Sequence, residues 1–150
     1  MRKVLLIILL FSTIISSGCN RSEEVEISSP SYMYSKDSDI SEKVEVALKA
    51  YYNEDDDNYE GSLLINEFSF EKVLFKHNSL LIAYDGSERI VLGDIYLNKN
   101  EGQFTIIITE PTLYRKLTKK DIKESNLVIS LPASNQKEAK EIEKSLKTME

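Results

Sequence analysis

The stretch Phe104-Thr105-Ile106-Ile107-Ile108-Thr109 consists of aromatic and β-branched residues and carries no charge. Residues of these types are enriched in β-strands, where their side chains pack well on a pleated surface. Because no position in the stretch is charged, it is the best candidate in the chain for the central strand of a sheet.

Similar strand signals lie upstream and are separated by turn residues. The expected strands are Val73–Phe75, Leu80–Tyr84 and Arg89–Leu97, with turns at His77-Asn78, Asp85-Gly86 and Asn98–Gly102. Glycine and asparagine in short gaps between apolar runs are typical of turns. Parallel strands need long crossover connections, so these short gaps predict antiparallel hairpins. One more strand is expected at Leu127–Leu131.

An amphipathic helix is expected before the strands. Asp39, with Glu42 three residues later, has the pattern of a capping box. Apolar residues then follow at helical spacing: Ile40, Val44, Ala47, Leu48 and Tyr51. The polar run Glu54–Asn58 ends the pattern.

Two helices are expected in the C-terminal part. Thr118 and Asp121 can cap a short helix that runs to about Glu124. A final helix begins near Asn135, with Glu138 at its third position, and carries an apolar stripe: Ala139, Ile142, Leu146 and Met149. The stripe predicts docking on the sheet or on another protein.

Together these elements predict an α+β fold, with a mainly antiparallel sheet of about four to five strands packed by an N-terminal and a C-terminal helix. The first expected helix ends in Ala50-Tyr51-Tyr52-Asn53 and is followed by a meander of strands. This arrangement resembles the start of cystatin-like and NTF2-like small domains. The resemblance implies an opening helix before the sheet and assigns no functional residues.

The N-terminus has the features of a secretion signal. Arg2 and Lys3 precede a run of 12 residues, Val4–Ile15, which is apolar except for Ser12 and Thr13. A membrane-spanning helix needs about 20 apolar residues, so this length favours a cleaved signal. The only cysteine of the chain, Cys19, comes directly after the small residue Gly18.

The sequence Ser17-Gly18-Cys19 resembles the lipobox of bacterial lipoproteins, although Ser16 stands where that family most often has leucine. The resemblance implies that Cys19 becomes the mature N-terminus and carries a diacylglyceryl group. It implies a lipid-anchored protein at the cell membrane or the outer membrane, facing outside the cytoplasm. The alternative is an ordinary secretory signal, which would leave Cys19 as a free thiol in an oxidising compartment.

We therefore expect a signal peptide over residues 1–18, a lipidated cysteine with a flexible tether over 19–38, and a single α+β domain over 39–150. The tether is inferred from a Ser- and Glu-rich composition without periodicity. Tyr32-Met33-Tyr34 is its apolar exception, expected to be solvated, packed on the domain or in contact with a partner.

The net charge is unevenly placed along the chain. Residues 20–60 hold 12 acidic and 4 basic side chains, a net charge of −8, whereas residues 61–150 hold 13 of each. An acidic segment near the anchor disfavours nucleic acid and is repelled by anionic lipid headgroups. We expect contact with the membrane through the lipid, a protein partner in the envelope, and no nucleic acid.

One motif resembles an EF-hand calcium loop: Asp56-x-Asn58-x-Glu60-Gly61-x-Leu63-x-x-x-Glu67. Calcium prefers several oxygen ligands, and glycine permits the sharp turn of such a loop. Tyr59 and Leu64, however, occupy positions that are usually polar in EF-hands. The alternative is an acidic connection between a helix and a strand that binds no metal.

The other polar residues form no recognisable catalytic set. His77 is the only histidine and is expected in an exposed turn. No Gly-x-Ser-x-Gly motif or glycine-rich phosphate loop occurs. We therefore assign no catalytic, cofactor-binding or metal-binding residue, and Cys19 is the one site residue, for lipidation. A basic cluster is interpreted as a solvated face or as a contact with anionic lipid or an acidic wall polymer: Arg115, Lys116, Lys119, Lys120 and Lys123.

These observations favour a non-catalytic, membrane-anchored bacterial lipoprotein whose small domain binds or modulates another envelope component. One alternative is a small envelope hydrolase that uses a pair of carboxylates. The other is a calcium-dependent binding module.

Overall fold

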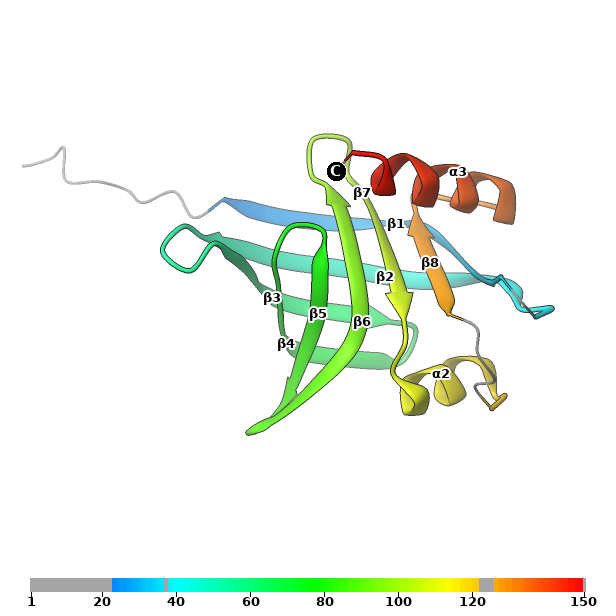
Figure 1. Cartoon of the computed structure of the whole chain (residues 1–150), viewed down its shortest axis with the longest axis horizontal. Helices are drawn as coiled ribbons and strands as arrows, with labels where there is room; N and C mark the ends of the chain where they lie inside the picture. Colours follow the sequence, from blue (N-terminus) through cyan, green and yellow to red (C-terminus); the bar gives the residue numbers. More distant parts are fainter. Residues whose placement is uncertain (1–22, 37, 122–125, 150) are drawn as a thin grey trace, which may run out of the picture.

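The computed structural model describes residues 23–36, 38–121 and 126–149. Cys19 and the expected signal peptide lie outside these residues. Eight antiparallel strands form a closed barrel in which each strand pairs with the next and β8 pairs with β1 (Figure 1). The strands are β1 Glu24–Ser35, β2 Ser41–Asn53, β3 Asn58–Ile65, β4 Phe68–Phe75, β5 Ser79–Asp85, β6 Glu88–Asn98, β7 Gln103–Ile108 and β8 Leu127–Leu131.

The expected α+β fold is therefore wrong. The closed barrel has eight strands, and within the described residues it carries two short helices, α2 Pro111–Thr118 and α3 Gln136–Lys147. The resemblance to cystatin-like and NTF2-like domains is not confirmed, because residues 41–53, which were expected to form the opening helix, are a strand. The hairpins expected between Val73 and Thr109 are confirmed, since β4 to β7 pair in sequence order and antiparallel.

The expected N-terminal helix is strand β2. Its buried residues alternate with exposed ones at Val44, Val46, Leu48 and Ala50. Val44 and Leu48 suit either a helix or a strand, whereas Val46 and Ala50 suit only the two-residue period of a strand. Gly61 of β3 lies so close to β2 that a Cβ there would be 1.9 Å from the Lys49 carbonyl oxygen.

Most of the expected tether is strand β1. Val25 and Ile27 alternate with glutamates and point into the barrel, and Met33 is fully buried. The last residues of the strand pair with β8, as in the register Tyr34↔Val128. The pairing of β1 with both β2 and β8 closes the barrel.

Large apolar side chains fill the barrel interior. Those that are almost fully buried include Leu48, Leu63, Ile65, Phe75, Leu81, Leu92, Ile95, Phe104 and Ile106. The burial of these side chains is the main source of stability for such a fold. No described helix is long and apolar enough to cross a membrane.

Helix α2 lies at one end of the barrel, below the strands in Figure 1. The helix expected to begin at Thr118 does not begin there, because α2 begins at Pro111 and Lys119 ends it in a left-handed conformation. Residues 122–124 of that expected helix lie outside the described residues. Proline suits a first helical position because its missing N–H would have no helical partner there. Leu113, Tyr114 and Leu117 of α2 belong to the barrel core.

Helix α3 packs on the outside of β7, β8 and β1. Asn135 caps it, as expected, by accepting a 3.0 Å hydrogen bond from the Glu138 backbone N–H. Ala139 and Leu146 are buried as the apolar stripe predicts, and Ile142 is partly buried. The docking of this helix on the sheet is confirmed.

Candidate functional site at the ends of the barrel

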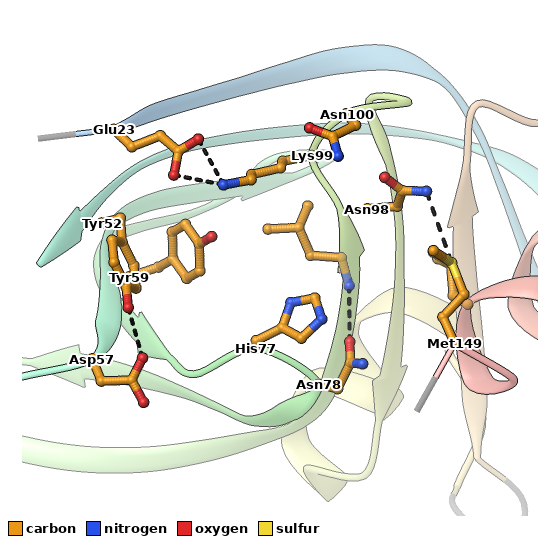
Figure 2. A pocket seen from close by; sticks show the side chains of 12 residues that line it. Glu23, Tyr52, Asp57, Tyr59, His77, Asn78, Asn98, Lys99, Asn100 and Met149 are labelled. Atoms are coloured by element: carbon orange, nitrogen blue, oxygen red, sulfur yellow. Dashed lines mark hydrogen bonds and ion pairs between the residues drawn. The ribbon is translucent and has the colours of Figure 1, made fainter. Parts of the chain in front are cut away.

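The two ends of the barrel differ in chemistry. One end is formed by the β2–β3, β4–β5 and β6–β7 turns, with Glu23 and Met149 beside them. It holds a pocket of about 420 Å³, which we call the polar mouth; its lining includes Glu23, Tyr52, Asp57, Tyr59, His77, Asn78, Asn98, Lys99 and Asn100 (Figure 2).

Asparagine and aspartate side chains shape the turns around the polar mouth. In the β2–β3 turn, Asn53 Oδ1 accepts hydrogen bonds from the backbone N–H groups of Asp55 and Asp56, at 3.0 and 3.4 Å. Asn98 Oδ1 accepts a 3.3 Å bond from the Glu101 N–H in the β6–β7 turn. Such side-chain bonds to the following backbone favour tight turns, and Asn98 both forms its turn and lines the pocket.

Two pairs of charged or polar groups cross the rim of the polar mouth. Lys99 Nζ lies 2.6 Å from both carboxylate oxygens of Glu23, and Tyr52 Oη donates a 2.7 Å hydrogen bond to Asp57 Oδ1. Figure 2 shows the two pairs on separate sides of the pocket. The hydrogen bond to Glu23 raises the pKa of Lys99, and the bond to Asp57 raises the pKa of Tyr52.

An aromatic stack supports one wall of the polar mouth. The ring centroids of Tyr52 and Tyr59 are 5.0 Å apart at an angle of 50°, and those of Tyr59 and Phe75 are 5.0 Å apart at 11°. Tyr59 is buried, and this burial raises the pKa of its hydroxyl. The wall is therefore anchored in the barrel core and presents the half-exposed Tyr52 to the pocket.

His77 lies in the β4–β5 turn and is exposed, as expected. The structure brings it to the polar mouth with Lys99 and Asp57, which the sequence did not predict. Because these residues lie in three separate turns, their approach depends on the closure of the barrel.

The resemblance of Asp56–Glu67 to an EF-hand calcium loop is not confirmed by the structure. Asp56 lies in the β2–β3 turn and Glu67 in the β3–β4 turn, with the whole of β3 between them. A strand of 8 residues spans about 26 Å at 3.3 Å per residue, so the two carboxylates lie at opposite ends of the barrel. Among residues 23–36, 38–121 and 126–149, no three His, Cys, Asp or Glu side chains are arranged to hold a metal ion.

The opposite end of the barrel holds a second pocket of about 460 Å³ between β4, β6 and α2. We call it the apolar cleft; its apolar residues are Phe68, Phe70, Ile90, Leu92 and Leu113, and its charged residues are Glu67, Glu88, Glu110 and Lys116. Sequence reasoning missed this pocket, although the alternation of Phe68 and Phe70 indicated a strand with one apolar face.

Interruptions in the sheet open the apolar cleft. The β4–β5 pairing covers only Lys72–Phe75, and the β5–β6 register shifts between Leu81 and Ile82. At this shift Gly93 has φ 148°, and a Cβ there would lie 1.8 Å from the Ile107 carbonyl oxygen. A side chain is excluded at this bend. The last β5 residue that pairs with β4 is Tyr84, and the β5–β6 hairpin extends away from the start of β4 (Figure 1).

The basic cluster lies on and just after α2. Arg115, Lys116, Lys119 and Lys120 are exposed, whereas Lys123 lies outside the described residues. Lys116 Nζ lies 5.8 Å from the centroid of the Phe68 ring, across the apolar cleft. Part of the cluster is therefore engaged with the protein itself.

Comparisons with known proteins found no match. No protein-family model, no curated protein and no solved structure matches the chain. Function is therefore inferred from the two ends of the barrel and from the N-terminal sequence.

Proposed function

We propose that the protein is a lipid-anchored, non-catalytic binding module of the bacterial cell envelope. We propose further that its polar mouth binds an uncharged, hydroxyl-rich ligand at the membrane surface. The observation that carries the proposal is that Glu23, four residues after Cys19, belongs to the rim of the polar mouth.

The proposed anchor is supported by the basic residues, the short apolar run and the small residues before Cys19. Four residues span at most about 14 Å. A lipid on Cys19 would hold the polar mouth close to the membrane, since most of the expected tether is strand β1. Two acyl chains suffice for stable anchoring.

A binding role is supported by the state of the ionisable groups in the polar mouth. Acid–base catalysis favours groups with a pKa near the working pH. The bonds to Glu23 and Asp57 instead move the pKa values of Lys99 and Tyr52 further above neutrality. Lys99 is also already paired with Glu23, and Tyr52 is already bonded to Asp57.

The ligand class follows from the lining of the polar mouth. Asn78, Asn98 and Asn100 offer amide donors and acceptors, and His77 adds a ring nitrogen. The acidic turn Glu54–Asp57 beside them repels anions. A hydroxyl-rich neutral molecule, such as a glycan or the sugar headgroup of a glycolipid, matches these amide groups and can pack on Tyr52.

Titration calorimetry on the full chain in phosphatidylcholine vesicles tests the ligand. Chitotriose serves as the soluble glycan, and vesicles that contain diglucosyl diacylglycerol serve as the glycolipid. We expect heat with at least one of them, and a roughly tenfold loss of affinity in the double variant His77→Ala/Asn100→Ala, because two polar contacts disappear. Ser87→Ala, in the β5–β6 turn at the other end, is the control and should bind normally.

Heat from neither probe, or equal binding by the double variant, would remove the polar mouth as the ligand site. The anchor is tested separately by fractionation of cells that express the chain or its Cys19→Ser variant. We expect the chain in the membrane fraction and the variant outside it. A Cys19→Ser variant that stays with the membranes would contradict lipid anchoring.

A further inference from the structure

Part of strand β4 has an unpaired edge beside the apolar cleft. Residues Phe68–Phe70 pair with β3, but within the described chain the pairing with β5 begins only at Lys72. We call Phe68–Glu71 the free edge. Among the residues that the structure describes, its backbone N–H and C=O groups on the β5 side have no strand partner, and such an edge is a template for another extended chain.

The free edge adjoins an apolar surface that suits side chains of an added strand. Phe68 and Phe70 are partly buried and face the barrel core together with Ile90. Alternate side chains of a strand placed along the edge would enter the apolar cleft of about 460 Å³. Peptide recognition by strand addition combines these features, since the backbone gives affinity and pockets give specificity.

The charged side chains at the rim of the apolar cleft determine which kind of added strand can bind there. Glu67 and Glu88 are exposed carboxylates of the rim. The Glu110 carboxylate is already used, because it accepts hydrogen bonds from the backbone N–H groups of Thr112 and Leu113. Lys116 lies over the Phe68 ring. The remaining negative charge favours a strand with basic side chains among its apolar ones.

We propose that the free edge and the apolar cleft bind an extended segment of a partner protein, with alternating apolar and basic residues, which adds to β4 as a strand. A small apolar ligand would fill the cleft but leave the backbone groups of the edge unpaired. The edge is only four residues long, which limits uncontrolled aggregation. The site is separate from the polar mouth and does not depend on a lipid on Cys19.

The test uses the full chain in phosphatidylcholine vesicles and the peptide acetyl-Lys-Val-Lys-Val-Lys-Val-Lys-amide. In a strand, alternate residues direct their N–H and C=O groups to opposite edges. We therefore compare two N-methylated peptides, one methylated on the valines and the other on the inner lysines. One of the two should lose binding, while the other keeps the affinity of the parent peptide. The parent should slow amide hydrogen exchange at residues 68–71.

Charge variants test the rim. The double variant Glu67→Gln/Glu88→Gln should bind the parent peptide roughly tenfold more weakly, because two ionic contacts are lost. The control variant Glu26→Gln/Glu42→Gln removes the same charge from exposed residues outside the apolar cleft and should bind normally. A peptide with glutamates in place of the lysines should not bind.

Several results would overturn the proposal. The peptide could fail to bind at millimolar concentration, or slow exchange only at the polar mouth. Equal binding by both N-methylated peptides would show that the cleft takes side chains without strand pairing. Protection of residues 68–71 that rises with protein concentration and needs no peptide would assign the edge to a second copy of the chain. None of these results bears on glycan binding at the polar mouth.

Discussion

The two faces of strand β7 are both buried, but by different means. Phe104, Ile106 and Ile108 point into the barrel, where they are fully buried among apolar side chains. Thr105 and Ile107 point outward and are also buried, on the side of the strand on which α3 packs. The inner face needs only apolar volume, whereas the outer face depends on a helix that arrives from a distant part of the chain.

Some of the side chains that are buried on the outer face are polar. Thr105 Oγ1 and Ser130 Oγ share a 2.8 Å hydrogen bond between β7 and β8. The Glu143 carboxylate of α3 accepts a hydrogen bond from Tyr34 and bonds of 2.8 and 2.9 Å from Lys36 and Lys147. Among the described residues, each buried side-chain polar atom has a partner. The outer layer is thus specified by paired polar groups and the inner layer by packing.

The largest effect on the free energy of unfolding is expected from a substitution on the inner face of β7. Phe104→Ala removes a fully buried ring from the barrel core and should lower the free energy of unfolding by about 3–5 kcal/mol, since it loses apolar burial and leaves a cavity. Urea denaturation followed by circular dichroism measures the change.

Leu80→Ala is the matched control on the barrel surface. Leu80 is 47% exposed, so its truncation should cost well under about 1 kcal/mol. Equal effects of the two variants would mean that the barrel interior contributes no more to stability than its surface.

This contrast also explains which strands the sequence could predict. Phe104–Thr109 lacks charge because most of the strand is buried on both sides, so its central place was evident. Strand β1 was missed because Ser28, Ser29 and Pro30 interrupt its alternation. Its pairing with β8 joins residues such as Tyr34 and Val128, and no local pattern predicts a contact across that sequence distance.

The pockets at the two ends of the barrel could be predicted from the sequence only in part. The turns at His77-Asn78 and Asn98–Gly102 were found, yet their convergence on one pocket requires a closed barrel. Glu143 could have been noticed, because it lies on the same helical face as Ala139 and Leu146. A carboxylate in an apolar stripe indicates a buried partner, and here the partners are Tyr34 and two lysines.

The second-largest effect on the free energy of unfolding is expected from a substitution of Glu143, and this effect depends on pH. Burial opposes ionisation of this carboxyl group, but hydrogen bonds from Lys36, Tyr34 and Lys147 outweigh it and lower the pKa from 4.5 to about 2. Because the folded pKa is depressed, the stabilisation is complete above the unfolded pKa and is lost as the pH falls towards 2. Glu143→Gln should therefore cost about 1–3 kcal/mol at pH 7, less than full linkage because the lysines reach solvent.

Urea denaturation of the parent and variant between pH 7 and pH 2 measures this contribution. The difference in unfolding free energy between them should be constant down to about pH 5 and then shrink. Glu141→Gln, on the exposed side of α3, is the control and should change stability by less than about 0.5 kcal/mol. A difference that stays constant down to pH 2 would contradict the depressed pKa.

The smallest effect is expected at the start of α3. Asn135→Ala removes the side-chain oxygen that accepts the Glu138 N–H and should cost about 1 kcal/mol, because one backbone donor at the helix end loses its partner. Ser134→Ala is the control, since Ser134 contributes its backbone N–H to Glu138 and not its hydroxyl. Chemical denaturation at pH 7 measures both variants. If Asn135→Ala cost more than Glu143→Gln, the end of the helix and not its buried carboxylate would hold α3 on the outer face of β7.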